Sequence, residues 1–162
     1  MQKKYRLCAG CVVFNREGNV LLGNRIDMKS DSWQFPQGGI ELDETPEEAA
    51  KRELFEETNV TSVKTVYSYE HPLRYDFPTD VINNFLKRGI ISSGQDIYFS
   101  LFFFDGNDSE ISAQTSQPEF KELQWHSLDF AVENIVYFKR GVYKTIAECF
   151  KPIIVQYLSK LS

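Results

Sequence analysis

The stretch that decides the fold is residues 37–60, which read QGGIELDETPEEAAKRELFEETNV. Two adjacent glycines lead into a segment that has no helix breaker before Asn59, and this pattern predicts a helix. Thr45 stands at the expected N-cap, Pro46 at the first helical position and Glu48 three residues after the cap, which is a capping box with a preorganised first turn. Asn59 can adopt the left-handed conformation that ends a helix.

Three glutamates share one face of this expected helix. Glu53, Glu56 and Glu57 are spaced i, i+3, i+4, so their carboxylates are neighbours. Such carboxylates repel one another unless a cation lies between them, and hard oxygen ligands select Mg²⁺ or Mn²⁺. The spacing alone also fits an acidic face exposed to solvent. Gly38 and Gly39 favour the metal interpretation, because a glycine loop can approach a ligand closely and offer it a carbonyl oxygen.

The same residues carry a resemblance to a known family. Gly38, Glu44, the run Arg52-Glu53-Leu54-Phe55-Glu56-Glu57-Thr58 and Val60 resemble the Nudix box at every position but one. The family has glycine where this chain has Asn59, the residue best able to replace glycine in a left-handed conformation. The resemblance implies an α/β fold, a Nudix-type α/β/α sandwich with a mixed β-sheet, and a metal-dependent pyrophosphohydrolase.

Length and composition limit the possible number of domains, the partners and the location of the protein. The 162 residues fit one domain over residues 1–162, and 42% hydrophobic residues predict a well-filled core. The net charge of −5 does not attract nucleic acid over the whole surface, so we expect no duplex DNA partner. We find no cleavable leader and no apolar run of membrane-spanning length, and therefore expect a cytoplasmic protein without a membrane partner.

The cysteines offer a competing motif. Cys8 and Cys11 form a Cys-x-x-Cys pattern, and Cys149 is distant in sequence. Residues 5–14 are predicted to be a buried strand, and positions three apart on a strand point to opposite faces. The pair would therefore not bind one zinc ion, and we expect core cysteines in a reducing compartment.

The remaining sequence predicts a mixed sheet between helices. Residues 72–94 are the least regular part and have a length typical of a lid or recognition loop. Residues 96–104 are apolar on both faces and are expected to form a central strand. Pro152 is expected to kink or divide the last helix. The predicted strands are 5–14, 20–25, 63–69, 96–104 and 120–125, and the further helices are 81–87, a short one opening at Ser127, and 141–161.

Segments outside the Nudix box indicate which subfamily the chain resembles. Residues 33–40, Leu73-Arg74-Tyr75 and residues 138–143 are similar to bacterial RNA pyrophosphohydrolases and plant-type diadenosine tetraphosphate hydrolases. This implies a Mg²⁺-dependent enzyme that removes phosphates from the 5′-triphosphate end of RNA and leaves a 5′-monophosphate. The alternative is asymmetric hydrolysis of diadenosine polyphosphates into ATP and AMP. Asp43 replaces the usual glycine of these relatives, which bears on affinity for long RNA more than on the chemistry.

The chemistry needs an activated water and neutralised phosphate charge. Glu53, Glu56 and Glu57 are the expected catalytic residues and Mg²⁺ ligands, with Glu53 the first choice for the base and Mn²⁺ a possible substitute. The Gly38 carbonyl is a further expected ligand, and the resemblance adds Glu119, for which a surface carboxylate is the alternative. Arg52 is expected to hold the acidic cluster by ion pairing.

Candidates for substrate binding lie outside the helix. Arginine offers paired donors that match phosphate oxygens, and an aromatic ring can stack on a base. For each candidate the alternative is an ordinary surface charge or a core aromatic, and His71 and His126 are expected to be structural. The candidates are Arg6, Arg25, Arg74, Lys139 and Arg140 for phosphate, and Tyr75 and Phe138 for a base.

A different class remains open, namely a Nudix-fold module that binds a nucleotide without cleaving it. Such a module would be expected to have lost acids of the box, and all three are present. The sequence leaves the oligomeric state unknown.

Overall fold

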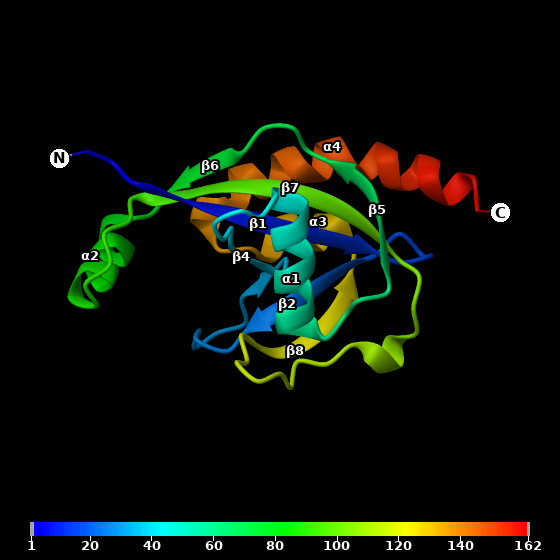
Figure 1. Cartoon of the computed structure of the whole chain (residues 1–162), viewed down its shortest axis with the longest axis horizontal. Helices are drawn as coiled ribbons and strands as arrows, with labels where there is room; N and C mark the ends of the chain where they lie inside the picture. Colours follow the sequence, from blue (N-terminus) through cyan, green and yellow to red (C-terminus); the bar gives the residue numbers. More distant parts are fainter. Residues whose placement is uncertain (1, 162) are drawn as a thin grey trace.

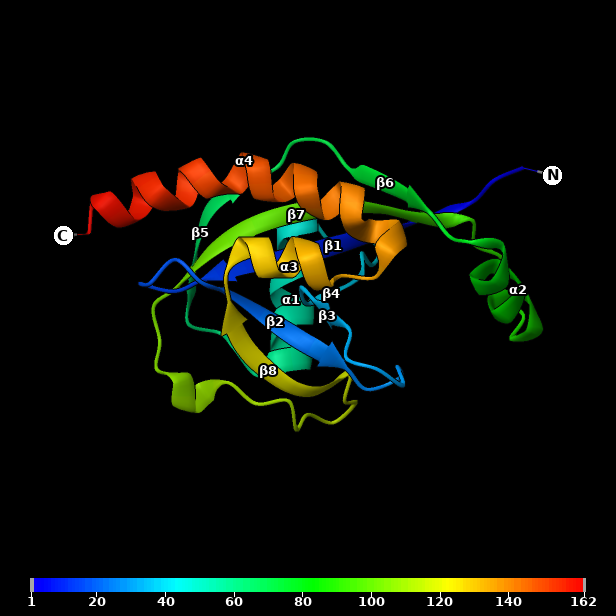
Figure 2. The same cartoon turned by 180° about the vertical axis from the view of Figure 1, so that it is seen from behind.

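The computed structural model describes residues 2–161. Figures 1 and 2 show a sheet covered by α1 on one face and by α3 and α4 on the other. Its elements are β1 (Tyr5–Phe14), β2 (Val20–Arg25), β3 (Trp33–Gln34), β4 (Gln37–Gly39), α1 (Pro46–Thr58), β5 (Val63–Ser68), β6 (Leu73–Asp76), α2 (Thr79–Lys87), β7 (Gly94–Phe104), the 3₁₀ turn η1 (Asp108–Glu110), β8 (Phe120–His126), α3 (Leu128–Asn134), the 3₁₀ turn η2 (Tyr137–Lys139) and α4 (Arg140–Ser159).

The sheet has eight strands and is mixed. Its main order is β3-β2-β1-β7-β5, and β4, β6 and β8 pair with β1, β7 and β2 respectively. β1 and β7 run parallel from the pair Tyr5–Gly94 to the pair Phe14–Phe103, while the other pairings are antiparallel. The predicted mixed sheet between helices is thus confirmed, and β7 is central as expected.

β1 separates two hydrophobic cores because its side chains alternate between the faces of the sheet. Cys8 lies in the core beneath α3 and α4, whereas Cys11 lies in the core beneath α1. Both are fully buried free thiols, so the predicted core role is confirmed. The Cys11 thiol donates to the Ala50 carbonyl at 3.0 Å, which joins α1 to the strand under it.

α1 begins and ends where the sequence predicts. Thr45 Oγ1 accepts from the Glu48 N–H at 3.1 Å, and Glu48 Oε1 accepts from the Thr45 N–H at 2.9 Å. Asn59 closes the helix with φ 66°, and Asp43 has φ 69°. At both positions the related proteins have glycine, and here the residue adopts a left-handed conformation. Asn and Asp are the residues other than glycine that tolerate this conformation best.

Two expectations need correction. The helix predicted at 81–87 is present as α2, but residues 72–94 also contain the strand β6, and β7 begins at Gly94, two residues before its predicted start. β6 was missed because it is only four residues long and gains its order by pairing with β7. Pro152 does not divide the last helix, since α4 continues through it. None of the helices in residues 2–161 is long and apolar enough to cross a membrane.

The end of α1 gives a stability prediction. Asn59→Ala forces a residue with a Cβ into the left-handed region, at about 1–2 kcal/mol. It also removes the 2.9 Å bond from Asn59 Nδ2 to the Glu110 carbonyl, worth about 1 kcal/mol. Asn59→Gly loses only that bond. Urea unfolding should rank the wild type above Asn59→Gly and Asn59→Gly above Asn59→Ala, and the reverse order of the two variants would contradict this account.

Candidate active site

A cavity of about 610 Å³ lies beside the N-terminal part of β1. The β4 loop and the acidic face of α1 form one wall, while β6, α2 and the segment around η2 form the other. β4 reaches this place because it pairs antiparallel with β1, with Gly38 opposite Ala9. Sheet pairing therefore fixes the glycine loop against the helix that follows it.

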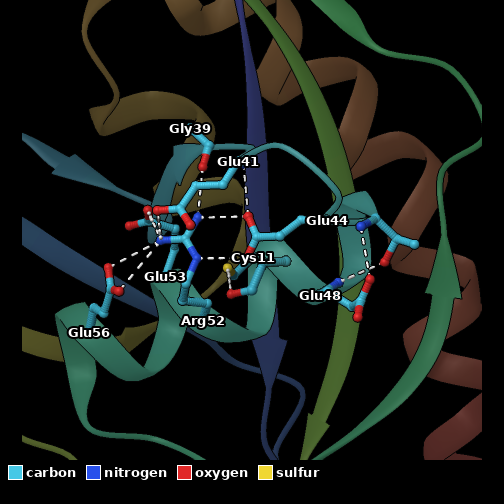
Figure 3. A network of polar contacts seen from close by, with 10 residues as sticks. Cys11, Gly39, Glu41, Glu44, Glu48, Arg52, Glu53 and Glu56 are labelled. Carbon is cyan, nitrogen blue, oxygen red and sulfur yellow. Dashed lines mark hydrogen bonds and ion pairs between the residues drawn. The ribbon is translucent and has the colours of Figure 1, made fainter.

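Arg52 connects the acidic helix to the loop, as Figure 3 shows. Its guanidinium donates to both carboxylate oxygens of Glu44, at 2.7 and 3.0 Å, and to the Gly39 carbonyl at 2.8 Å. It also contacts Glu53 at 2.8 Å and Glu56 at 3.3 Å. The predicted ion-pairing role of Arg52 is confirmed. The guanidinium holds the pKa of Glu44 down to about 2, chiefly through its hydrogen bonds.

Glu57 is the buried member of the acidic face. It is 5% exposed, and its carboxylate accepts from the Gln37 N–H at 3.0 Å. Burial raises the pKa of Glu57 to about 9, and the negative charges of Glu53 and Glu119 add to the shift. Burial also raises the pKa of Glu53, against the opposing effect of Arg52. The metal-free protein therefore holds carboxylates that favour a bound proton or cation.

The glycine loop lies close against the side-chain ends of Glu53 and Arg6. A Cβ atom at Gly38 would lie 2.0 Å from Cδ of Glu53, and one at Gly39 would lie 2.5 Å from an Arg6 guanidinium nitrogen. A larger residue at either position would require the end of the neighbouring side chain to shift, and the predicted approach of this loop to a ligand stays a prediction.

The donor chemistry of this wall fits a hard divalent cation. Glu53, Glu56, Glu57 and Glu119 line one common pocket of about 250 Å³ beside the main cavity. Within residues 2–161, however, no group of three or more Asp, Glu, His or Cys side chains is arranged so that it could hold a metal ion. Arg52 accounts for part of this, since it draws the carboxylates of Glu53 and Glu56 toward itself. A cation would have to compete with that guanidinium, and ligation by these residues stays a prediction.

Five of the predicted substrate-binding residues line the cavity. The Lys139 side chain is buried without a hydrogen bond or ion pair among the described residues, and its ammonium lies 5.2 Å from the centre of the Tyr75 ring. Burial and the nearby Arg25 lower the pKa of Lys139 to about 7. An anion in the cavity would pair with the ammonium form of Lys139 and favour it over the neutral amine. The five are Arg6, Arg25, Tyr75, Phe138 and Lys139.

The structure does not bring Arg74 and Arg140 to this cavity. Arg74 donates to both carboxylate oxygens of Asp96 at 2.8 and 2.9 Å and stacks over the Tyr5 ring at 3.7 Å. On β6 its side chain points to the face opposite that of Tyr75. Arg140 is exposed at the start of α4 and does not line the cavity. Both phosphate assignments are withdrawn for this reason.

Tyr75 also needs a different role from the predicted base stacking. It is 5% exposed, its ring packs against Phe77 and Phe138, and its hydroxyl donates to Gln95. Little of the ring remains for a ligand. His126 stacks on Phe130 at 3.7 Å between ring centres, so its predicted structural role is confirmed.

Sequence reasoning missed several lining residues. Gln34, Gln37 and Gln95 bring carboxamides from three strands, and α2 contributes Val81, Asn84 and Phe85. Only the closeness of Gln34 and Gln37 to the glycine loop in sequence could have indicated two of these three residues. The helix itself was predicted at 81–87, but nothing local placed it at the cavity, because its position depends on how the chain leaves β6. The Oε1 atoms of Gln34 and Gln37 are buried without a hydrogen-bond partner in residues 2–161, so the cavity suits a ligand that carries donors.

Glu57 gives a test that separates stability from binding. Its folded pKa of about 9 lies above the ordinary value of 4.5, so the unfolded chain releases this proton first as the pH rises. The metal-free protein should lose stability as the pH rises from about 4.5 toward about 9. Glu57→Gln should remove this loss and raise the Tm at pH 8 by at least about 2–4 °C, which corresponds to about 1 kcal/mol in a chain of this size.

The measurement is thermal unfolding with and without Mg²⁺ at pH 4 and pH 8. Near pH 4 the advantage of Glu57→Gln should vanish, because the wild-type carboxyl is then protonated in both states. Added Mg²⁺ should stabilise the wild type more than the variant. An advantage that is the same at both pH values would refute this account of Glu57.

Comparison with known proteins places the chain in a family. The model of the NUDIX domain matches residues 4–146. A protein of Wolbachia sp. subsp. Drosophila simulans named RNA pyrophosphohydrolase is 41% identical over 153 residues, which cover 93% of this chain and 92% of that protein. The protein of the same name from Roseobacter denitrificans is 40% identical and covers 91% of this chain and 92% of its own length.

Solved structures agree on the fold. A C. elegans Ap4A hydrolase superimposes with a TM-score of 0.64 at 18% identity and covers 96% of this chain and 98% of its own. A MutT protein from Methanosarcina mazei gives a TM-score of 0.62 at 18% identity, covering 91% of this chain and 96% of its own. Together with the match of the domain model over most of the sequence, this shows that the chain belongs to the Nudix family.

Proposed function

We propose that this chain is a Mg²⁺-dependent RNA 5′-pyrophosphohydrolase that converts a 5′-triphosphate end into a 5′-monophosphate. The main observation in support is that one cavity combines the acidic wall of α1 with the basic side chains of Arg6, Arg25 and Lys139. Relatives about 40% identical over nine-tenths of the chain are named RNA pyrophosphohydrolases, which supports RNA as the substrate.

Within this proposal the α1 carboxylates and the Gly38 carbonyl hold Mg²⁺, with Glu119 available from the loop before β8. A bound Mg²⁺ supplies charge neutralisation on the phosphates and acidifies a water molecule. Mn²⁺ offers similar oxygen-ligand chemistry and is expected to substitute. Glu53 accepts the proton of the attacking water, since its carboxylate is half-buried against the glycine loop and Arg52 limits its movement. Removal of this proton generates the nucleophile.

The cations of the opposite wall bind the polyphosphate. Lys139 gains an anionic partner that it lacks in the free protein, and the Arg6 guanidinium already lies against Gly39. Arg25 donates to both carboxylate oxygens of Asp27 at 2.6 and 3.0 Å, so it would exchange an exposed ion pair for phosphate contacts. Such a pair is weak in water, so the exchange costs little.

Two broader features belong to the same proposal. Both hydrophobic cores are built on one sheet, which supports a single domain over residues 1–162. The cysteines at positions 8, 11 and 149 are all free thiols, which supports a reducing, cytoplasmic location.

The deciding experiment compares the purified protein on triphosphorylated RNA, diadenosine tetraphosphate and nucleoside triphosphates. We expect the highest kcat/KM on triphosphorylated RNA, with a 5′-monophosphorylated product. Activity should be lost with a chelator and restored by Mg²⁺ or Mn²⁺. A higher kcat/KM on diadenosine tetraphosphate, with ATP and AMP as products, would favour the alternative. Substrates that all stay intact would favour a module that binds without cleaving.

Substitution of the acidic face tests the roles of its members. Glu53→Gln and Glu56→Gln should each lower kcat by at least about a hundred-fold, the scale of a lost acid–base group or ligand. Their Tm should stay close to wild type, because both carboxylates border the cavity and not the core. Glu47→Gln, on the same helix but outside the cavity, is the matched control and should keep full activity. Near-full turnover by both cavity variants would overturn the assignment.

A further inference from the structure

The strands β2 and β3 are joined by a loop of residues 26–32, which we call the β2–β3 loop. In Figure 2 it follows the arrowhead of β2, beside the chain that enters β8. Asp27 and Met28 of this loop line the main cavity, as does Arg25 immediately before it. Residues 26, 27 and 29–31 are exposed to solvent, so side-chain packing contributes little to the position of the loop. That position therefore depends mainly on hydrogen bonds.

Asn24 closes the neck of the β2–β3 loop. Its side chain is 3% exposed near the end of β2. Its Oδ1 accepts from the Ser32 N–H at 3.0 Å, and its Nδ2 donates to Oδ1 of Asp31 at 3.0 Å. One buried carboxamide thus binds the far end of the loop through both its acceptor and its donor. Truncation of this side chain would leave the buried Ser32 N–H without this acceptor.

The loop in turn holds Arg25 in two ways. The Arg25 N–H donates to the Ser32 carbonyl at 2.9 Å, and the guanidinium donates to both carboxylate oxygens of Asp27. A loop that opened at its neck would move Asp27 and release the guanidinium from its present orientation. A freely rotating arginine must be ordered when a ligand binds, and the lost side-chain entropy weakens the binding.

The outer part of the loop contacts the segment that carries Glu119. The Ile26 N–H donates to the Glu119 carbonyl at 3.0 Å, and the Lys121 ammonium donates to the Met28 carbonyl at 3.3 Å. Glu119 and Arg25 line the same cavity. The closed loop therefore lies between two cavity residues that come from different strand ends.

We propose that Asn24 is a positioning residue, which closes the neck of the β2–β3 loop and so holds Arg25 where it meets the phosphates of a ligand. This inference rests on the proposed function for the phosphate contact of Arg25. Asn24 does not line the cavity and needs no contact with the ligand. When a phosphate replaces Asp27 on the guanidinium, the bonds of Asn24 at the neck stay in place and keep the end of β2 fixed.

The first test measures phosphate binding without turnover. Inorganic triphosphate is titrated by calorimetry into metal-free protein, well below the Tm of every variant and at low ionic strength, where charge attraction is least screened. Arg25→Ala should weaken binding by about ten-fold or more, the scale of a lost charged hydrogen bond. Asn24→Ala should weaken it by at least about three-fold, because Arg25 loses its fixed orientation. Adding Asn24→Ala to Arg25→Ala should cause no further loss, whereas a general loosening of the fold would add to it.

An exchange of two side chains tests the bond at the neck itself. Asn24→Asp places a carboxylate against that of Asp31 and should weaken triphosphate binding. In Asn24→Asp/Asp31→Asn the carboxamide at position 31 can donate to the carboxylate at position 24, and the net charge equals that of the wild type. This double variant should recover most of the wild-type affinity. Asp31→Asn alone is the matched control, since its carboxamide oxygen still accepts from Asn24, and it should bind at least as tightly as the wild type.

The outcomes distinguish this inference from the proposed function. Wild-type affinity in Asn24→Ala, with a clear loss in Arg25→Ala, would overturn the role of Asn24 and leave the proposed function standing. Additive losses in the two alanine variants, or an exchange variant that recovers nothing, would do the same. Unchanged binding in Arg25→Ala would overturn both this inference and the phosphate contact of Arg25. Intact triphosphorylated RNA together with the expected binding pattern would instead refute the proposed function and leave the role of Asn24 standing.

Discussion

The candidate site depends on the way one guanidinium is shared among acidic groups and a loop carbonyl. Without Arg52, the carboxylates of Glu44, Glu53 and Glu56 would face one another on a half-buried surface with no compensating charge. Its bond to the Gly39 carbonyl also ties the loop to the middle of α1. The contact with Glu44 is the firmest of these, because both carboxylate oxygens receive a donor. Such paired contacts have directional geometry that a lysine would not reproduce.

The sheet makes this arrangement possible. The pairing of β4 with β1 places the glycine loop above the strand whose other residues anchor α1. The helix and the loop are thus held to the same strand from two directions, and a Cβ atom at Gly38 would force the Glu53 carboxylate to move. Core packing, capping and charge pairing all converge on one geometry, which is the expected mark of a sequence that specifies its fold. The carboxylate of Glu57 is the exception, since it is buried beside like charges at a cost to the metal-free protein. Functional sites are where such local conflicts are expected.

The sequence predicts correctly those elements whose structure depends on neighbouring residues in the chain. The ends of α1 follow from Thr45, Glu48 and Asn59 alone, and the structure has all three as expected. The opposite faces of Cys8 and Cys11 follow from the period of a strand. The helix at 81–87 was also predicted locally, and the structure has it as α2. Its place at the cavity could not be predicted, because β6 exists by pairing with β7 and the path between these two strands positions α2. The same holds for Arg74. Its residue type favoured a phosphate contact, but the register of β6 brings its side chain into an ion pair with Asp96.

The two walls of the cavity also differ in how firmly they are held. The acidic wall rests on a fully buried helix face, with Ala49, Ala50 and Leu54 at zero exposure. The opposite wall includes α2, which buries no residue and lines the cavity with Val81, Asn84 and Phe85. A rigid wall suits groups that must be placed to within a fraction of an ångström of reacting atoms. A wall with little burial can adjust to ligands of different length, and low local stability is typical of segments that move on binding. Under the proposed function, the firmly packed wall would carry the phosphate chemistry and the loosely packed wall would meet the rest of the ligand.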